Sequence, residues 1–165
     1  MRRALLVVVG LLLAVGVVMR CSPEEEVVPR PEDLKKEGDA YAAKREWGHA
    51  AERYRLAFAL EDPVPERARA RAWLAYHRGL TLARIPLAAD AGRWLDRALR
   101  LDPDLYVVHF ERGLLHDGRH PETADRKTAR EAFERFLAES ERAGSPPGDG
   151  PVAEEARRLL RTLTD

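Results

Sequence analysis

The chain has 165 residues, about the length of one domain, and its 28 basic and 28 acidic side chains give a formal net charge of zero. This balance argues against a nucleic-acid-binding protein, which needs a strongly basic domain or face. The single cysteine excludes a disulfide framework and a cysteine-ligated metal cluster, whereas 45% hydrophobic residues suffice to bury a core.

The first twenty residues have the pattern of a membrane-targeting segment. Arg2 and Arg3 precede the uncharged, mostly aliphatic stretch 4–19, and Arg20 and Cys21 follow it. A basic start followed by an apolar stretch is typical of a signal peptide or a signal anchor. As a helix, this stretch would span about 24 Å, short of a hydrocarbon core of about 30 Å. Snorkelling arginines and local thinning of the bilayer can cover that difference.

Three fates of this segment stay open. We favour an uncleaved anchor. The second is a lipoprotein lipidated on Cys21, but residues 18–21 resemble a bacterial lipobox only in part, because Arg20 stands where a small residue is needed. The third is ordinary cleavage after residues 14–16. Because almost all the basic residues are arginine, we interpret the source as a bacterium of high GC content. The positive-inside rule then predicts that residues 21–165 face the periplasm.

Residues 21–31 form a linker, because its three prolines disfavour a helix and its three glutamates keep it solvated. From residue 32 onward, long stretches rich in Ala, Leu, Arg and Glu are divided by Pro and Gly, which predicts helices throughout. The predicted helices are 32–44, 47–60, 65–84, 87–100, 104–117, 123–142 and 151–163. A loop at 144–150, rich in glycine and proline, separates the last helix from the others.

A pattern of small and large residues occurs three times in the helical region. The first copy has Gly38, Tyr41, Ala50, Tyr54 and Ala57, and the second has Gly79, Leu82, Ala91, Leu95 and Ala98 with identical spacing. The third copy has Gly113, Ala129, Phe133 and Phe136. The second and third glycines are 34 residues apart, whereas the first and second are 41 apart. The extra seven residues lie at 61–67, and they are two helical turns that can lengthen the helix 65–84 without changing its facing. The third copy has a longer turn at 117–126.

These residues resemble the tetratricopeptide repeat (TPR) family, most closely in the middle copy with its Tyr76-x-x-Gly79 and closing Asp102-Pro103. The resemblance implies an all-α fold, a right-handed superhelical stack of antiparallel helix pairs. It covers three pairs over 32–142, with residues 143–165 providing a loop and a capping helix.

The resemblance also implies a partner groove lined by the first helix of each pair. At the matching positions, the second copy has Trp73, Tyr76, Leu80 and Arg84, the third has Val107, Phe110 and Leu114, and the first has Glu32, Lys35 and Asp39. Exposed aromatic residues of this kind favour a peptide or an amphipathic helix as ligand. The alternative is that Trp73, Tyr76 and Phe110 belong to the core or are covered by the last helix.

The sequence contains little that points to catalysis. His109, His116 and His120 are spaced like residues of one helix face, but Gly118 interrupts the helix before His120, so we expect no metal site. Nothing forms a nucleophile–base pair or a phosphate-binding loop. We therefore expect a protein that is not an enzyme, without a cofactor or a nucleic-acid ligand.

Two functions remain. The first is a protein–protein interaction scaffold tethered to a bacterial membrane and facing the periplasm, which binds an envelope or assembly protein in the groove. The alternative is a structural subunit that self-associates through the same groove. Membrane-tethered TPR proteins often serve as scaffolds, and this analogy rests on the fold.

Overall fold

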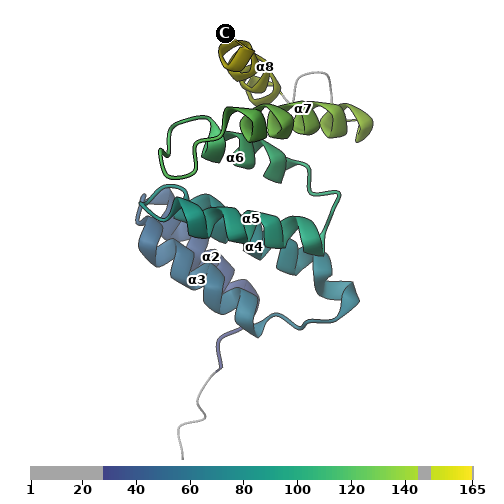
Figure 1. Cartoon of the computed structure of the whole chain (residues 1–165). Helices are drawn as coiled ribbons and strands as arrows, with labels where there is room; N and C mark the ends of the chain where they lie inside the picture. Colours follow the sequence, from purple (N-terminus) through teal and green to yellow (C-terminus); the bar gives the residue numbers. More distant parts are fainter. Residues whose placement is uncertain (1–27, 145–149, 165) are drawn as a thin grey trace, which may run out of the picture.

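The computed structural model describes residues 28–144 and 150–164, which form seven α-helices and one 3₁₀ turn (Figure 1). The 3₁₀ turn, η1 (Pro65–Arg67), leads directly into α4. The helices are α2 (Pro31–Ala43), α3 (Trp47–Leu60), α4 (Ala68–Leu82), α5 (Ala88–Leu101), α6 (Val107–His116), α7 (Arg126–Arg142) and α8 (Pro151–Thr164).

Several predicted features lie outside the described residues. They are the membrane segment 1–20, Cys21, the linker up to residue 27 and the loop residues 145–149. Within 28–144 and 150–164, no helix combines the length and the apolar character needed to cross a membrane.

The helices are arranged as a stack of pairs, as the repeat pattern predicts. Helix α2 packs with α3, α4 with α5, and α6 with α7, while α3 also packs on α4 and α5 on α6. Helix α8 packs on α7 and closes the stack at the end opposite to α2 (Figure 1). One pair alone cannot cover its apolar face, so each pair depends on its neighbour.

The three repeated glycines mark the closest approach within each pair. A Cβ atom added at Gly38 would lie 2.7 Å from the Tyr54 ring, and one at Gly79 would lie 2.8 Å from the Leu95 side chain. At Gly113 it would lie 2.5 and 2.6 Å from Cδ1 and Cζ of Phe133. The repeat pattern in the sequence is therefore a contact pattern: a glycine on the first helix accommodates a large buried residue on the second.

The buried side chains form two hydrophobic clusters. The larger one joins α2, α3, α4, α5 and the buried residues of α6, and the smaller one joins α7 to α8. The larger side chains of the smaller cluster are Phe133, Phe136, Leu159 and Leu163. Helices α7 and α8 thus share a core against which Phe110 and Leu114 of α6 also pack, while the buried residues of α6 belong to the larger cluster.

The seven extra residues between the first two repeats extend the start of the second pair. They form a short loop and η1 before α4, which begins eleven residues before Gly79, whereas α2 begins seven residues before Gly38. The buried Glu61 carboxylate lies 3.5 Å from Arg67 Nε and ties the two ends of the insertion together. The prediction that the seven residues add two α-helical turns is therefore wrong, and α4 spans Ala68–Leu82 within the predicted 65–84.

Helix α6 begins three residues later than the predicted 104–117. The side chain of Asp102 accepts a hydrogen bond from the Asp104 backbone N–H (3.1 Å), and the Tyr106 N–H donates to the Asp104 carbonyl (2.8 Å). These local bonds hold a turn that competes with helical hydrogen bonding. The helix therefore starts at Val107.

The turn between α6 and α7 is held by side-chain hydrogen bonds. The Thr123 hydroxyl donates to the Leu115 carbonyl at 2.6 Å. The Asp125 carboxylate accepts from two backbone N–H groups of the following turn, which makes it the N-cap of α7. The helix predicted at 123–142 accordingly begins at Arg126.

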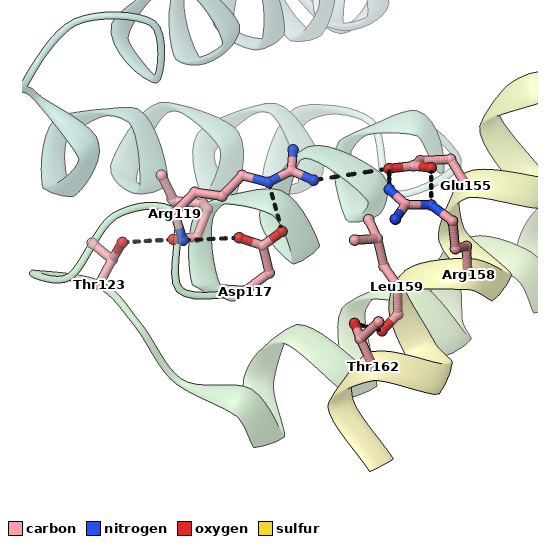
Figure 2. Close-up of polar contacts among 8 residues, drawn as sticks. Asp117, Arg119, Thr123, Glu155, Arg158, Leu159 and Thr162 are labelled. Carbon is pink, nitrogen blue, oxygen red and sulfur yellow. Dashed lines mark hydrogen bonds and ion pairs between the residues drawn. The ribbon is translucent and has the colours of Figure 1, made fainter. Parts of the chain in front are cut away.

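An arginine on this turn connects it to the closing helix (Figure 2). Arg119 Nε lies 3.0 Å from the Asp117 carboxylate, and its Nη2 lies 3.9 Å from Glu155 on α8. Glu155 also pairs with Arg158 one turn further along α8. The turn and α8 are therefore held together by side-chain charges as well as by the smaller hydrophobic cluster.

Candidate functional site

Helix α4 presents a row of aromatic side chains on the face opposite to Arg71 and Arg78. Tyr76 and His77 follow Trp73 by three and four residues, so each lies next to Trp73 on the helix surface. The Trp73 ring meets Tyr76 edge-on at 5.6 Å, and His77 stacks on Tyr54 of α3 at 5.2 Å. We call Tyr54, Trp73, Tyr76 and His77 the aromatic cluster. Tyr54 is buried, whereas the other three are half-buried and so partly open to a ligand.

Two hollows lie on either side of Trp73, which lines both. The α2–α4 hollow, of about 280 Å³, is lined by Pro31, Glu32, Lys35, Glu61, Arg67, Ala70, Trp73 and Leu74. The α4–α6 hollow, of about 470 Å³, is lined by Pro65, Ala68, Arg69, Trp73 and residues 101–107. The indole therefore forms a ridge between two cavities of side-chain size.

The insertion before α4 builds one wall of each hollow. Pro65 belongs to the α4–α6 hollow, while Glu61 and Arg67 belong to the α2–α4 hollow. A second pair beginning at the position equivalent to α2 would lack these residues. The lengthened start of α4 is therefore part of the candidate site and is more than a spacer.

The structure distributes the predicted groove residues of the second and third copies unevenly. Trp73 and Val107 line the α4–α6 hollow. Tyr76 belongs to the aromatic cluster, Leu80 is half-buried further along α4, and Arg84 is exposed beyond its end. The remaining two, Phe110 and Leu114, pack against the smaller hydrophobic cluster, just as Trp73, Tyr76 and Val107 pack against the larger one.

Phe110 is in contact with the core as well as with the surface. Its ring lies 5.8 Å from that of Phe133 and 5.4 Å from that of Phe136, both fully buried, and it is itself half-buried. A charge placed at Phe110 would therefore disturb the third pair. Trp73 also packs against the larger hydrophobic cluster, but it lines both hollows and is therefore the better probe of the groove.

The first-copy residues are engaged in polar contacts. Glu32 and Lys35 line the α2–α4 hollow. Asp39 accepts hydrogen bonds from Lys35 Nζ at 2.8 Å and from the Tyr54 hydroxyl at 2.7 Å. The charged end of the predicted groove thus adjoins the aromatic cluster through Tyr54.

Sequence reasoning missed His77 and Glu111. His77 lies one helical turn after Trp73, and this spacing could have placed it among the predicted groove residues of the second copy. Glu111 is half-buried on α6, and burial raises its pKa, although Arg84 and Arg119 oppose the shift. Burial raises the pKa of the Tyr76 hydroxyl, and the negative charge of Glu111 raises it further. No pattern in the sequence identifies Glu111, because its position depends on how α6 packs beside α4.

Protonation of His77 is expected to destabilise the domain. Burial lowers the pKa of His77 below its ordinary 6.5 and Lys35 lowers it further, while Asp39 opposes the shift. The folded state therefore prefers the neutral imidazole. This contribution to the free energy of unfolding is present above pH about 6.5 and is lost as the pH falls through that value towards the folded-state pKa. We expect a lower urea midpoint at pH about 5.5 than at pH about 7.5.

Two variants isolate the contribution of His77. His77→Phe keeps a ring against Tyr54 but cannot titrate, so it should flatten the pH dependence in part; His109, whose pKa burial also lowers, maintains the rest. His49→Gln removes an imidazole whose side chain is 74% exposed, and it serves as the exposed control variant. An unchanged slope in His77→Phe would contradict the assignment.

His109 and His116, two of the three histidines of the third copy, have separate structural roles. His109 is buried and its Nε2 lies 3.4 Å from Glu139, whereas His116 Nδ1 lies 2.5 Å from the Thr123 carbonyl in the turn. Among the residues that the structure describes, no group of three or more His, Cys, Asp or Glu side chains is placed to hold a metal ion.

No protein-family model matches the sequence, and no curated protein is similar to it. The fold, in contrast, is similar to solved structures. PcrH from Pseudomonas aeruginosa has a TM-score of 0.66 at 18% identity, covering 82% of this chain and 92% of that chain. PcrH in complex with the chaperone binding region of PopD gives 0.64 at 18% identity, with 81% and 90% covered.

A third similar structure is the first TPR of Spaghetti (RPAP3) bound to the HSP90 peptide SRMEEVD. It has a TM-score of 0.62 at 18% identity and covers 82% of this chain and 94% of that chain. Identities this low relate the folds alone. Together with the repeated glycine contacts and the stacked pairs, they show that this chain has the fold of a TPR domain, with about three repeats and a capping helix.

Proposed function

We propose that this protein is a non-enzymatic interaction scaffold that binds a peptide or amphipathic helix of an envelope or assembly protein across α4. The observation that carries the proposal is the position of Trp73, a half-buried indole between two hollows. A rigid aromatic ridge with a cavity on each side suits a ligand that places an apolar side chain into each cavity. Such central aromatic residues commonly carry most of the binding energy of an interface.

Two of the similar structures support a peptide as ligand. PcrH was solved with the chaperone binding region of PopD, and the RPAP3 domain with an HSP90 peptide. In this chain the corresponding ligand would contact Trp73, Tyr76 and Leu80 on α4 and Val107 on α6. Arg84 and Glu111 would place opposite charges near the end of the same surface.

We further propose that residues 1–20 hold the protein at a bacterial membrane, with residues 21–165 in the periplasm. The support is the sequence pattern of two arginines followed by an apolar stretch. The prolines and glutamates before α2 would separate the folded domain from the bilayer.

A crosslinked pull-down tests the proposal, with the full chain as bait in the membrane fraction of the source bacterium. We expect the wild type to capture a partner that Trp73→Ala loses, because a central aromatic truncation costs about 2–4 kcal/mol, or about 30-fold or more in affinity. Trp47→Ala is the matched control, because Trp47 is also half-buried but is the first residue of α3 and lines neither hollow. Far-UV circular dichroism checks that both variants stay helical.

The other outcomes are equally informative. Recovery of the bait alone would favour the alternative, a structural subunit that self-associates through the same surface. Capture that is the same with wild type and Trp73→Ala would move the binding face away from α4. A bait that is absent from the membrane fraction would contradict the tether.

A further inference from the structure

The opposite side of α4 carries a second feature that the proposed function does not use. Arg71 and Arg78 are two helical turns apart, so they lie on one face, about 200° around the helix from Trp73 and about 140° from Tyr76. Their side chains reach the second helices of the first two pairs, at Phe58 on α3 and Trp94 on α5. This surface is therefore separate from the aromatic cluster and its hollows.

Three guanidinium groups and two aromatic rings alternate on this surface. Arg78 lies over the Trp94 ring at 4.3 Å, Arg97 lies over Trp94 at 5.2 Å and over Phe58 at 4.5 Å, and Arg71 lies over Phe58 at 4.6 Å. The two rings meet edge-to-face at 5.1 Å. We call these five residues the arginine–aromatic ladder.

The three arginines of the ladder form no ion pair with any residue in the described part of the chain, unlike their neighbours. Nearby Arg55 pairs with Glu52, and Arg93 pairs with Asp90. In the ladder, Nε of Arg71 and both Nε and Nη1 of Arg78 are buried without a hydrogen-bond partner. Burial and the charge of Arg55 lower the pKa of Arg78. The fold therefore gathers three unmatched positive charges and desolvates part of them.

The rings hold these guanidinium groups in place through cation–π contacts. A guanidinium can bind a carboxylate through two parallel hydrogen bonds from its planar fork of N–H groups. Arg97 is exposed, and Arg71 and Arg78 are half-buried, so the ladder is accessible from solvent. The rings also restrict the side chains, so less conformational entropy is lost on binding.

The chemistry of the surface favours an acidic peptide over other polyanions. Nucleic acid requires a strongly basic domain, and this chain has a formal net charge of zero. Anionic lipid surfaces are recognised by clusters of about four to eight unpaired basic residues, more than the ladder provides. A short run of carboxylates matches a row of three guanidinium groups.

We propose that the arginine–aromatic ladder binds a short acidic segment of a partner protein through its carboxylates. This contact is independent of the groove and would allow one domain to hold two segments at once, one on each side of α4. Linking two such contacts raises the overall affinity without further contacts.

Fluorescence anisotropy of a fluorescein-labelled hexaglutamate peptide tests the proposal on the full chain in mild detergent. We expect saturable binding that weakens with salt, because the contacts are between charges near the surface. Arg97→Gln should raise the Kd about tenfold, the effect of losing a charged hydrogen bond. Arg97→Lys should also weaken binding, because a lysine keeps the charge but loses the planar fork.

The matched control is Arg157→Gln, which removes the same charge from an exposed position on α8. It should leave the Kd unchanged, as should Trp73→Ala, which separates this site from the groove. Equal loss with Arg157→Gln and Arg97→Gln would overturn the proposal, as would a wild-type chain that does not bind the peptide. Binding of phosphatidylglycerol vesicles that depends on Arg97, without binding of the peptide, would assign the ladder to the membrane and would also overturn it.

Discussion

Replacing Gly113 by alanine is expected to destabilise the protein by about 3 kcal/mol, measured as the free energy of unfolding in urea. The added methyl group would lie 2.5 Å from Cδ1 of Phe133, whose side chain is fully buried. The ring cannot withdraw easily, because the rings of Phe110 and the α8 side chains surround it. The better helix propensity of alanine, about 1 kcal/mol, offsets only part of this cost.

A second glycine provides the matched control. A methyl group at Gly48, near the start of α3, would meet no atom within 4 Å. Gly48→Ala should therefore be neutral or slightly stabilising. In the double variant Gly113→Ala/Phe133→Leu, a smaller side chain replaces the opposing ring. Its loss in free energy of unfolding should be smaller than the sum of the losses in the two single variants. If Gly113→Ala is as stable as Gly48→Ala, the close approach of α6 and α7 is wrong.

Ending the chain after Ala143 is expected to unfold the third helix pair while the first two pairs remain folded. The smaller hydrophobic cluster would lose Ala153, Ala156, Leu159 and Leu163, which exposes the Phe133 and Phe136 rings. The lost burial is on the order of 5 kcal/mol. Hydrogen–deuterium exchange should show α6 and α7 exchanging rapidly, with α3 to α5 still protected, because the larger cluster does not include α8.

Polar contacts add to this dependence on α8. Arg126 and Arg130 of α7 donate hydrogen bonds to the Thr162 and Leu163 carbonyls at 3.1 and 2.9 Å, which satisfies acceptors at the end of α8. The control is Arg157→Ala, on the exposed face of α8, which should leave the exchange pattern unchanged. Loss of protection in all helices together would show that the stack unfolds as one unit.

Local signals in the sequence were sufficient for the helices and their pairing. Prolines, glycines and the small–large pattern located all seven described helices to within a few residues, since these signals act over one or two turns. They did not predict the starts of α6 and α7. There, side-chain hydrogen bonds of Asp102 and Thr123 to the backbone compete with the helix, and the latter bond reaches back to Leu115 in the preceding helix.

The candidate site could be predicted only in part. Trp73 and Tyr76 follow from the repeat positions; both are half-buried against the larger hydrophobic cluster, and Trp73 also lines the two hollows. Phe110 has an equivalent position but contacts the buried rings of Phe133 and Phe136 on α7. Periodicity identifies which face a residue occupies, whereas neighbouring helices decide how much of that face is covered.

The sequence by itself determined the all-α class, the repeat and the residues that meet within each pair, because each of these depends on spacing along one or two adjacent helices. The tertiary structure alone decided three other features: the two hollows beside Trp73, the half-buried position of Glu111, and the ladder of Arg78, Trp94, Arg97, Phe58 and Arg71. The physical reason is that each of them is formed by side chains from helices of different pairs. Their distances depend on how the pairs stack, and no local pattern in the sequence specifies that packing.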